Sequence, residues 1–255
     1  MEKIMMICTL GPSTSYVYNH VSRDFDVNDV IVVNKEDRLV FLKKRIKRLG
    51  LWKVIGQVIF VLYSKVFLAK RVASRIRAIQ RQFNLDPDDV PKEKITHISS
   101  VNSKEMKQKI REVDPDLIII NGTPIIKADI LDATDAKFIN IHVGITPKYR
   151  GVHGAYWALY NKDEDLVGVT THFVDKGIDS GAVLDQKVVR VTEDDNFLTY
   201  SHLQLGHALK DYNKTIQSVL NNRFTVKQPL TAESALWSHP TILSYFYGRV
   251  VRKVK

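Results

Sequence analysis

Two polar side chains, Asn140 and His142, lie two residues apart in a β-branched apolar run. Residues two apart in an extended strand point to the same face, so the amide and the imidazole should lie side by side, while Ile139, Ile141 and Val143 face the opposite way into the core. An amide can donate to a developing oxyanion, and an imidazole can transfer a proton or carry a positive charge. Asp179 follows in a loop with two glycines, where it could orient His142 or accept a proton through water. These groups suit acyl-type transfer, although a polar pair at a strand end is more often structural than catalytic.

Two longer motifs contain these residues. Residues 140–151 read Asn-Ile-His-Val-Gly-Ile-Thr-Pro-Lys-Tyr-Arg-Gly, and residues 168–181 read Gly-Val-Thr-Thr-His-Phe-Val-Asp-Lys-Gly-Ile-Asp-Ser-Gly. With these motifs, the chain from about Asp114 to Leu220 resembles the formyltransferases that use 10-formyltetrahydrofolate, which include glycinamide ribonucleotide, methionyl-tRNA and sugar-amine enzymes. The resemblance implies a Rossmann-like fold and formyl transfer to a primary amine. It also implies Asn140, His142 and Asp179 as the catalytic residues.

The same resemblance implies where the formyl donor, 10-formyltetrahydrofolate, binds as a cosubstrate. Two segments would line a pterin pocket, largely through backbone groups. Their residues are Gly122, Thr123, Pro124, Ile125 and Ile126 in the first, and Val174, Asp175, Gly177 and Ile178 in the second. We expect no metal, because no set of Cys and His has the spacing of metal ligands. A nicotinamide cofactor is disfavoured, because the pattern Gly-x-Gly-x-x-Gly is absent.

Strand-like and helix-like segments alternate around these motifs. This alternation favours an α/β fold with a mostly parallel sheet covered by helices, in which ligands bind at the carboxyl ends of strands. Apolar, β-branched runs predict strands at Ile4–Thr9, Val30–Val33, Leu117–Ile120, Phe138–Val143, Val167–Val174 and Ala182–Val191. Composition and apolar spacing predict helices at Ser103–Val113 and Ile125–Thr134 and one long helix at Asn196–Leu220, whereas the tail from Pro229 looks irregular.

The formal net charge of +10 is concentrated in one segment. Residues 38–81 contain thirteen Lys or Arg and no Asp or Glu, so the rest of the chain is slightly acidic overall. Within this segment, apolar residues recur every three or four positions, which predicts a helical insertion with one apolar face. We therefore predict a catalytic domain at 1–228 with a basic helical insertion at 38–83, and a short C-terminal extension at 229–255.

The insertion admits several interpretations. It could be a solvated helical pair packed on the domain, or a homodimer contact. It could instead be a basic amphipathic element that rests on an anionic membrane surface. Nucleic acid is disfavoured as a partner, since few aromatic residues are interleaved for base stacking. We reject a transmembrane span because polar residues interrupt the apolar run, at Lys53, Gly56, Gln57, Ser64 and Lys65.

Weaker signals concern the amine acceptor. Glycinamide ribonucleotide enzymes carry a Gly- and Ser-rich phosphate loop after the first strand, where this chain has Leu10-Gly11-Pro12-Ser13. Gly11 and Ser13 could still cradle a phosphate at a helix start, and a plain turn with a helix cap is an equal alternative. Tyr149 and Arg150 could bind an acceptor phosphate, although Arg150 could equally brace its loop. His153 could approach the acceptor, whereas His172 is interpreted as a half-buried structural histidine.

From these observations we expect N-formyl transfer from 10-formyltetrahydrofolate to an amino sugar, nucleotide- or lipid-linked, in surface polysaccharide synthesis. About 35 residues follow Leu220, whereas methionyl-tRNA enzymes carry a sizeable β-rich C-terminal domain, so a tRNA acceptor is disfavoured. A hydrolase that releases formate and a non-catalytic membrane-surface binding protein on this scaffold remain as alternatives. The single cysteine, Cys8, excludes an internal disulfide and favours the cytoplasm, with peripheral contact at the inner membrane surface as an option.

Overall fold

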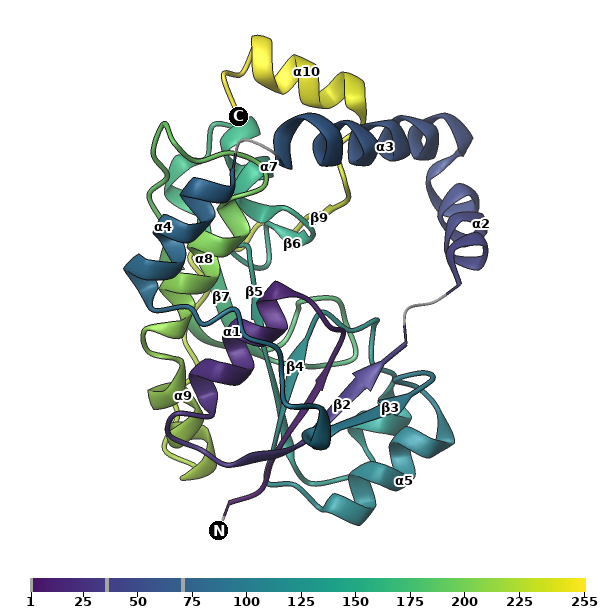
Figure 1. The fold of residues 1–255 in the computed structure, drawn as a ribbon, viewed down its shortest axis with the longest axis vertical. Coiled ribbons are helices and arrows are strands. Elements are labelled where there is room, and N and C mark those ends of the chain that lie inside the picture. Colours follow the sequence, from purple (N-terminus) through teal and green to yellow (C-terminus); the bar gives the residue numbers. More distant parts are fainter. Residues whose placement is uncertain (1, 35–36, 70–71) are drawn as a thin grey trace.

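A seven-stranded sheet forms the centre of the computed structural model, which describes residues 2–34, 37–69 and 72–255 (Figure 1). The strand order is β3-β2-β1-β4-β5-β7-β8. β7 runs antiparallel to both of its neighbours, and the other strand pairs are parallel. The predicted α/β class with a mostly parallel sheet is thus confirmed. The seven strands are β1 Ile4–Cys8, β2 Val27–Val33, β3 Ile95–Ile98, β4 Leu117–Asn121, β5 Lys137–His142, β7 Gly168–Phe173 and β8 Val183–Val188.

Helices cover both faces of the sheet, because its central strands are apolar on both sides. Ile4, Met6 and Cys8 of β1 enter one hydrophobic core, and Met5 and Ile7 enter the other. The first core is closed by α1 Pro12–Val21, α4 Ala73–Phe83, α8 Tyr200–Leu209 and α9 Tyr212–Leu220. The second is closed by α5 Lys104–Val113 and α6 Ala128–Leu131.

Two of the helix predictions were wrong in extent. The single long helix expected at 196–220 is two helices, α8 and α9, which are separated at Lys210 and Asp211. The helix expected at 125–134 is confined to the single turn of α6, because residues 123–127 form an irregular segment. Each of the predicted strands is present, with ends that differ from the prediction by up to three residues.

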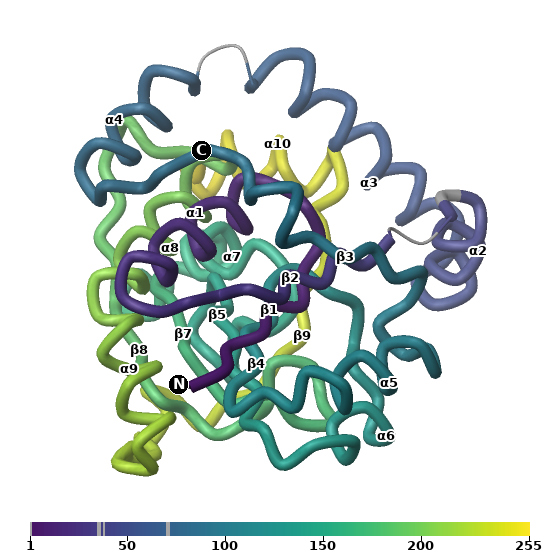
Figure 2. Tube along the Cα trace, turned by 60° about the horizontal axis from the view of Figure 1, so that its bottom comes forward, coloured from purple at the N-terminus to yellow at the C-terminus, as the bar shows by residue number. Residues whose placement is uncertain are grey.

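The described part of the basic insertion contains three α-helices that play different structural roles. α4 belongs to the domain core through Ile79 and Phe83, and its Arg75 forms an ion pair with the buried Asp195 (Nε–Oδ1, 2.8 Å). By contrast, α2 Arg38–Leu49 and α3 Leu51–Tyr63 run around the rim of the molecule (Figure 2). A π-helical turn at Ser64–Leu68 continues α3.

The polar residues in 51–68 do not interrupt this helix. By length and composition alone, Leu51–Leu68 is long and apolar enough to cross a membrane, with 22% of the stretch buried. The prediction that polar residues make this stretch too polar to cross a membrane is therefore wrong. One face of the helix nevertheless packs on the domain, where Phe60 is fully buried against Phe197 and Tyr245.

The tail from Pro229, expected to be irregular, contains two ordered elements. β9 Leu236–Trp237 pairs with β6 Arg150–Gly151 in a second small sheet. α10 Ile242–Val250 begins with a capping box, in which the Thr241 side chain accepts from the Ser244 N–H and the Ser244 side chain accepts from the Thr241 N–H. The remaining helix is α7 Gly154–Tyr160, and short 3₁₀ turns lie at Lys92–Lys94 and Glu164–Leu166. The domain boundary at 228 stays a prediction.

Candidate active site

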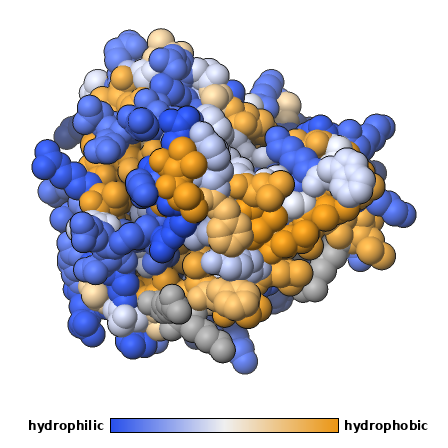
Figure 3. Space-filling view, turned by 90° about the horizontal axis from the view of Figure 1, so that it is seen from above, coloured by the Kyte–Doolittle hydropathy of each residue, from blue (hydrophilic) through white to orange (hydrophobic). Residues whose placement is uncertain are grey.

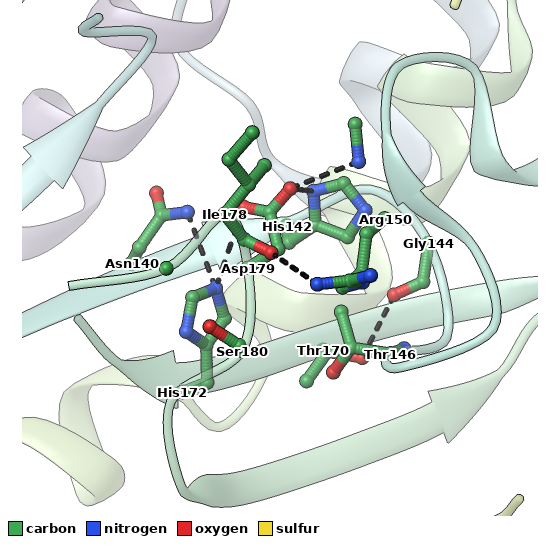
Figure 4. Close-up of polar contacts among 12 residues, drawn as sticks. Asn140, His142, Gly144, Thr146, Arg150, Thr170, His172, Ile178, Asp179 and Ser180 are labelled. Atoms are coloured by element: carbon green, nitrogen blue, oxygen red, sulfur yellow. Dashed lines mark hydrogen bonds and ion pairs between the residues drawn. The ribbon is translucent and has the colours of Figure 1, made fainter. Parts of the chain in front are cut away.

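The three predicted catalytic residues meet at the end of β5. Asn140 and His142 lie on this strand, and Asp179 reaches them from the loop that joins β7 and β8 (Figure 4). Ile139 and Ile141, which alternate with them, lie in the hydrophobic core as the strand period predicted. The prediction was wrong for Val143, which follows the end of β5 and lines the cavity. The antiparallel register of β5 and β7 places His172 directly opposite Asn140, so a second histidine joins the cluster.

His172 fixes the orientation of the Asn140 amide. Its Nδ1 donates to the carbonyl of Phe173 at 2.7 Å, which leaves Nε2 to accept from Asn140 Nδ2 at 3.3 Å. Burial lowers the pKa of His172, which is 2% exposed, and the neutral ring that results suits this accepting role. The second N–H of the Asn140 amide remains able to donate to a ligand.

Asp179 lies between the two histidine rings. Its Oδ2 is 3.3 Å from His142 Nδ1, and its Oδ1 is 3.8 Å from His172 Nε2. Gly151 N–H donates to the same carboxylate at 3.0 Å, which helps to hold it there. On the other side of His142, Nε2 donates to the carbonyl of Tyr149 at 2.7 Å, because a carbonyl oxygen only accepts. The arrangement directs Nδ1 of His142 at the carboxylate.

Two glycines permit this close arrangement. A Cβ on Gly144 would overlap the Tyr149 carbonyl oxygen and lie 2.7 Å from His142 Nε2. A Cβ on Gly181 would overlap the carbonyl oxygen of Phe173, which accepts from His172. Any side chain at either position would therefore displace a histidine or its partner.

The cluster forms part of the wall of a cavity of about 730 Å³. This volume lies within the range of small-molecule sites, which is roughly 300–1,000 Å³. The cavity is lined by all three predicted catalytic residues and by all nine residues predicted to bind the donor, which lie in segments 122–126 and 174–178. Their roles in binding and catalysis stay predictions.

Of the residues predicted to contact the acceptor, Ser13 lines the cavity and four others do not. Gly11 precedes α1. The Tyr149 ring is fully buried, and its hydroxyl donates to Asp163. Arg150 donates to the carbonyl of Ile178 at 3.4 Å, so it braces the loop next to Asp179. His153 lies 2.9 Å from His239 (Nε2 to Nδ1), and burial lowers its pKa to about 3.

Other cavity residues come from segments that sequence reasoning did not connect with the site. Phe41, Arg45 and Arg48 of α2 line the cavity, as do residues 236–239 around β9. Arg45 Nε donates to Gln57 Oε1 at 2.9 Å, while its Nη2 is buried without a hydrogen-bond partner. The basic composition of 38–48 was visible in the sequence, but tertiary packing decides which side of α2 faces the cavity.

No group of three or more His, Cys, Asp or Glu within the described ranges could hold a metal ion. The expectation that the reaction needs no metal stays a prediction.

Comparison with known proteins supplies a family match. A family model described as formyl transferase matches residues 29–212. Two methionyl-tRNA formyltransferases match a shorter part. The protein from Caldanaerobacter subterraneus subsp. tengcongensis is 33% identical over 99 residues, which are 38% of this chain and 32% of that protein. The one from Thermodesulfovibrio yellowstonii is 36% identical over 95 residues, or 37% and 30% of the two chains. The match thus spans about a third of the length of these relatives.

Solved structures show the same fold. A sugar N-formyltransferase from a Shewanella species has a TM-score of 0.57 at 19% identity, with coverage of 92% of this chain and 76% of that one. Phosphoribosylglycinamide formyltransferase from Streptococcus pneumoniae has a TM-score of 0.53 at 19% identity, with coverage of 86% and 99%. At these identities the likeness concerns the fold.

Proposed function

Because the chain belongs to the formyl transferase family, whose members use 10-formyltetrahydrofolate as donor, we propose that it transfers a formyl group to the primary amine of an amino sugar. The observation that carries this proposal is the convergence of Asn140, His142 and Asp179 on one cavity of about 730 Å³. We assign the reaction to the cytoplasm, because a chain with one cysteine, Cys8, has no internal disulfide, and disulfides are typical of oxidising compartments.

The cavity wall suits the donor. The side chains of Pro124, Ile125, Ile126 and Ile178 provide an apolar surface for a flat heterocycle, and the irregular backbone at 122–126 offers N–H and C=O groups to its polar edge. The catalytic cluster adjoins this wall, so a donor bound there would present its formyl carbon to Asn140.

The donor supplies the formyl carbon, and each residue of the cluster has a separate task in the proposed reaction. The unengaged N–H of Asn140 donates to the charge that develops on the formyl oxygen as the acceptor nitrogen attacks. His142, held by Tyr149 and Asp179, stabilises the same charge. Asp179 accepts the surplus proton of the acceptor nitrogen through a water. The donor nitrogen gains a proton as it leaves, so the transfer is neutral overall.

We assign the binding of the acceptor phosphate to α2. The segment 10–13 after β1 has no cation, and Gly11 does not line the cavity. Arg45 and Arg48 do line it. A guanidinium group in a cavity wall can donate charge-assisted hydrogen bonds to the oxygens of a phosphate. An amino sugar that carries a nucleotide or lipid phosphate has both required groups, the amine and the anion.

An acceptor screen tests the proposal. The protein is incubated with 10-formyltetrahydrofolate and with amino-sugar nucleotides, lipid-phosphate-linked amino sugars, glycinamide ribonucleotide or methionyl-tRNA, and products are followed by mass spectrometry. We expect the phosphate-bearing amino sugars to gain one formyl group. Formylation of only the ribonucleotide or the tRNA would overturn the sugar acceptor while preserving formyl transfer. Formate release at the same rate without any amine would identify a hydrolase.

Arg45→Gln and Arg48→Gln are expected to raise the KM of a phosphate-bearing acceptor about tenfold or more, the effect typical of a lost charge-assisted hydrogen bond. The KM of the donor should stay within about twofold of wild type, since the donor is assigned to segments 122–126 and 174–178 and not to α2. Initial-rate kinetics with each substrate varied in turn measure both values.

Lys47→Gln is the matched control, because it removes an exposed cation from the same helix that does not line the cavity. If Lys47→Gln raises the acceptor KM as much as the two arginine variants do, the effect is due to net charge and the phosphate site is refuted.

A further inference from the structure

A broad apolar face lies on the outside of α3, its π-helical continuation and α10. Most of the large apolar side chains that are exposed in the described part of the chain belong to these elements or to the start of α2. We call this face the apolar platform. It consists of Leu51, Trp52, Ile55, Val58, Ile59, Leu62, Val66, Phe67, Leu243, Phe246, Tyr247, Val250 and Val251.

The platform is one continuous surface. Tyr63 of α3 contacts Tyr245 and Phe246 of α10, with ring centroids 5.9 Å and 5.3 Å apart. Gly56 lies close enough to Thr241 that an added Cβ would be 3.0 Å from the threonine Cβ. The two helices lie side by side at the top of Figure 1, and the view from above in Figure 3 shows the apolar residues gathered there with hydrophilic residues around them.

The opposite face of the helix at 51–68 is anchored to the domain. Gln57 Nε2 donates to Ser238 Oγ at 3.2 Å and to the His239 carbonyl at 2.6 Å. Phe60 is fully buried, with its ring 4.8 Å from that of Phe197. A helix held in this way lies flat along the protein, although its length and composition would allow it to cross a membrane. Its exposed side is then available to an interface parallel to the helix axis.

The exposed apolar residues of the platform extend along the whole helix at 51–68 and along α10. A helix of 18 residues is about 27 Å long, at 1.5 Å per residue. Contiguous exposed apolar patches on soluble monomers are typically no more than about 300–600 Å², and larger ones mark interaction sites. Trp52 and Leu243, which are 83% and 79% exposed, would be left in water without a partner.

The charges around the platform indicate which kind of partner it binds. Residues 38–81 contain no Asp or Glu, and neither do the residues after Glu233. Exposed Lys53 and Lys65 lie on the platform helix, and exposed Arg249 and Lys253 lie at the end of α10. A second copy of the chain would bring two such basic surfaces together, which like-charge repulsion opposes. An anionic bilayer matches both the apolar and the basic character.

We propose that the apolar platform rests in the headgroup region of an anionic lipid bilayer, and that the acceptor enters the cavity from this surface as a lipid-linked amino sugar. The second part rests on the proposed function. α2 joins the two sites, because it is followed by α3 after Gly50 and its Phe41, Arg45 and Arg48 line the cavity. An acceptor phosphate at these arginines would leave its lipid chain directed toward the platform.

Vesicle flotation with the full chain tests the docking surface independently of catalysis. The probes are vesicles of phosphatidylcholine alone and of phosphatidylcholine with phosphatidylglycerol, both without acceptor. We expect binding to the anionic vesicles that weakens with added salt. Trp52→Glu and Phe67→Glu should each lower the binding constant at least tenfold, because each removes a large apolar side chain from the interface and adds a negative charge.

Leu230→Glu is the matched control, since Leu230 is 52% exposed and lies outside the platform. It should bind vesicles as wild type does, and unchanged thermal unfolding confirms that all three variants fold. Equal binding to neutral and anionic vesicles, or binding to neither, overturns the proposal. A dimer that Trp52→Glu converts to a monomer, with no vesicle binding by wild type, overturns it in favour of self-association.

Formylation rates test separately whether the acceptor enters the cavity from the membrane surface. With a lipid-linked amino sugar in anionic vesicles, Trp52→Glu should lower the formylation rate at least tenfold, while a soluble amino-sugar nucleotide should be formylated at the wild-type rate. Wild-type rates with the vesicle substrate would overturn it. Loss of activity toward every amine, with vesicle binding intact, would instead refute the proposed function and leave the docking surface standing.

Discussion

Replacing Asn140 by alanine should lower kcat for formyl transfer by about 10²–10³, the usual effect of removing one oxyanion donor. The amide has one N–H engaged with His172 Nε2 at 3.3 Å and a second that points to no protein acceptor. A hydrogen bond from this second N–H stabilises the transition state, in which the formyl oxygen carries charge, more than it stabilises the bound donor. The KM of the donor should therefore change by less than about threefold. Steady-state kinetics with saturating acceptor measure both values.

The fold should survive this substitution. Asn140 is partly exposed to the cavity, so water can replace the lost amide at His172, and the free energy of unfolding should fall by no more than about 1 kcal/mol. Chemical denaturation checks that value. A variant with normal stability and an undiminished kcat would show that the amide takes no part in the transfer.

Replacing Asp179 by asparagine should lower kcat by about 10²–10⁴, the range attributed to a positioned general base. The asparagine side chain is nearly isosteric and can still accept from the Gly151 N–H, so the loop keeps its position. The negative charge beside His142 Nδ1 and His172 Nε2 is lost, together with the group that takes the acceptor proton. Single-turnover rates with preformed donor complex isolate this step from product release.

Asp132→Asn provides the comparison for Asp179→Asn. Asp132 is exposed and lies 3.9 Å from Lys176, so its loss changes the net charge near the same loop without touching the cavity. It should leave kcat within about twofold of wild type, as exposed ion pairs contribute little. A similar fall in kcat for both variants would mean that the long-range field, rather than the position of Asp179, is responsible.

The sequence was most informative where a local rule decides the structure. The strand period of two predicted that Asn140 and His142 share a face and that Ile139 and Ile141 enter the core, and the structure agrees. Predicted family membership, carried by the two long motifs, is confirmed by the family model over residues 29–212. The grouping of segments 122–126 and 174–178 around one cavity was anticipated from that resemblance and not from residue spacing.

The features that sequence reasoning missed depend on contacts between distant segments. His172 was interpreted as a structural histidine, because nothing local reveals that the register of β5 and β7 sets it opposite Asn140. The orientation of Arg45 toward the cavity depends on Gln57, which is itself held by the distant Ser238 and His239. The capping box that starts α10, at Thr241 and Ser244, was a local signal that could have been recognised.

The most direct test follows the formyl carbon of isotopically labelled 10-formyltetrahydrofolate in the presence of a phosphate-bearing amino sugar. If Asn140, His142 and Asp179 carry the reaction, the wild-type protein should place the label on the amine, with one N-formyl product for each tetrahydrofolate formed. Asp179→Asn should form almost none while its fold is intact. Label recovered as formate at a rate independent of the amine, or N-formyl product formed equally well by Asp179→Asn, would contradict the account.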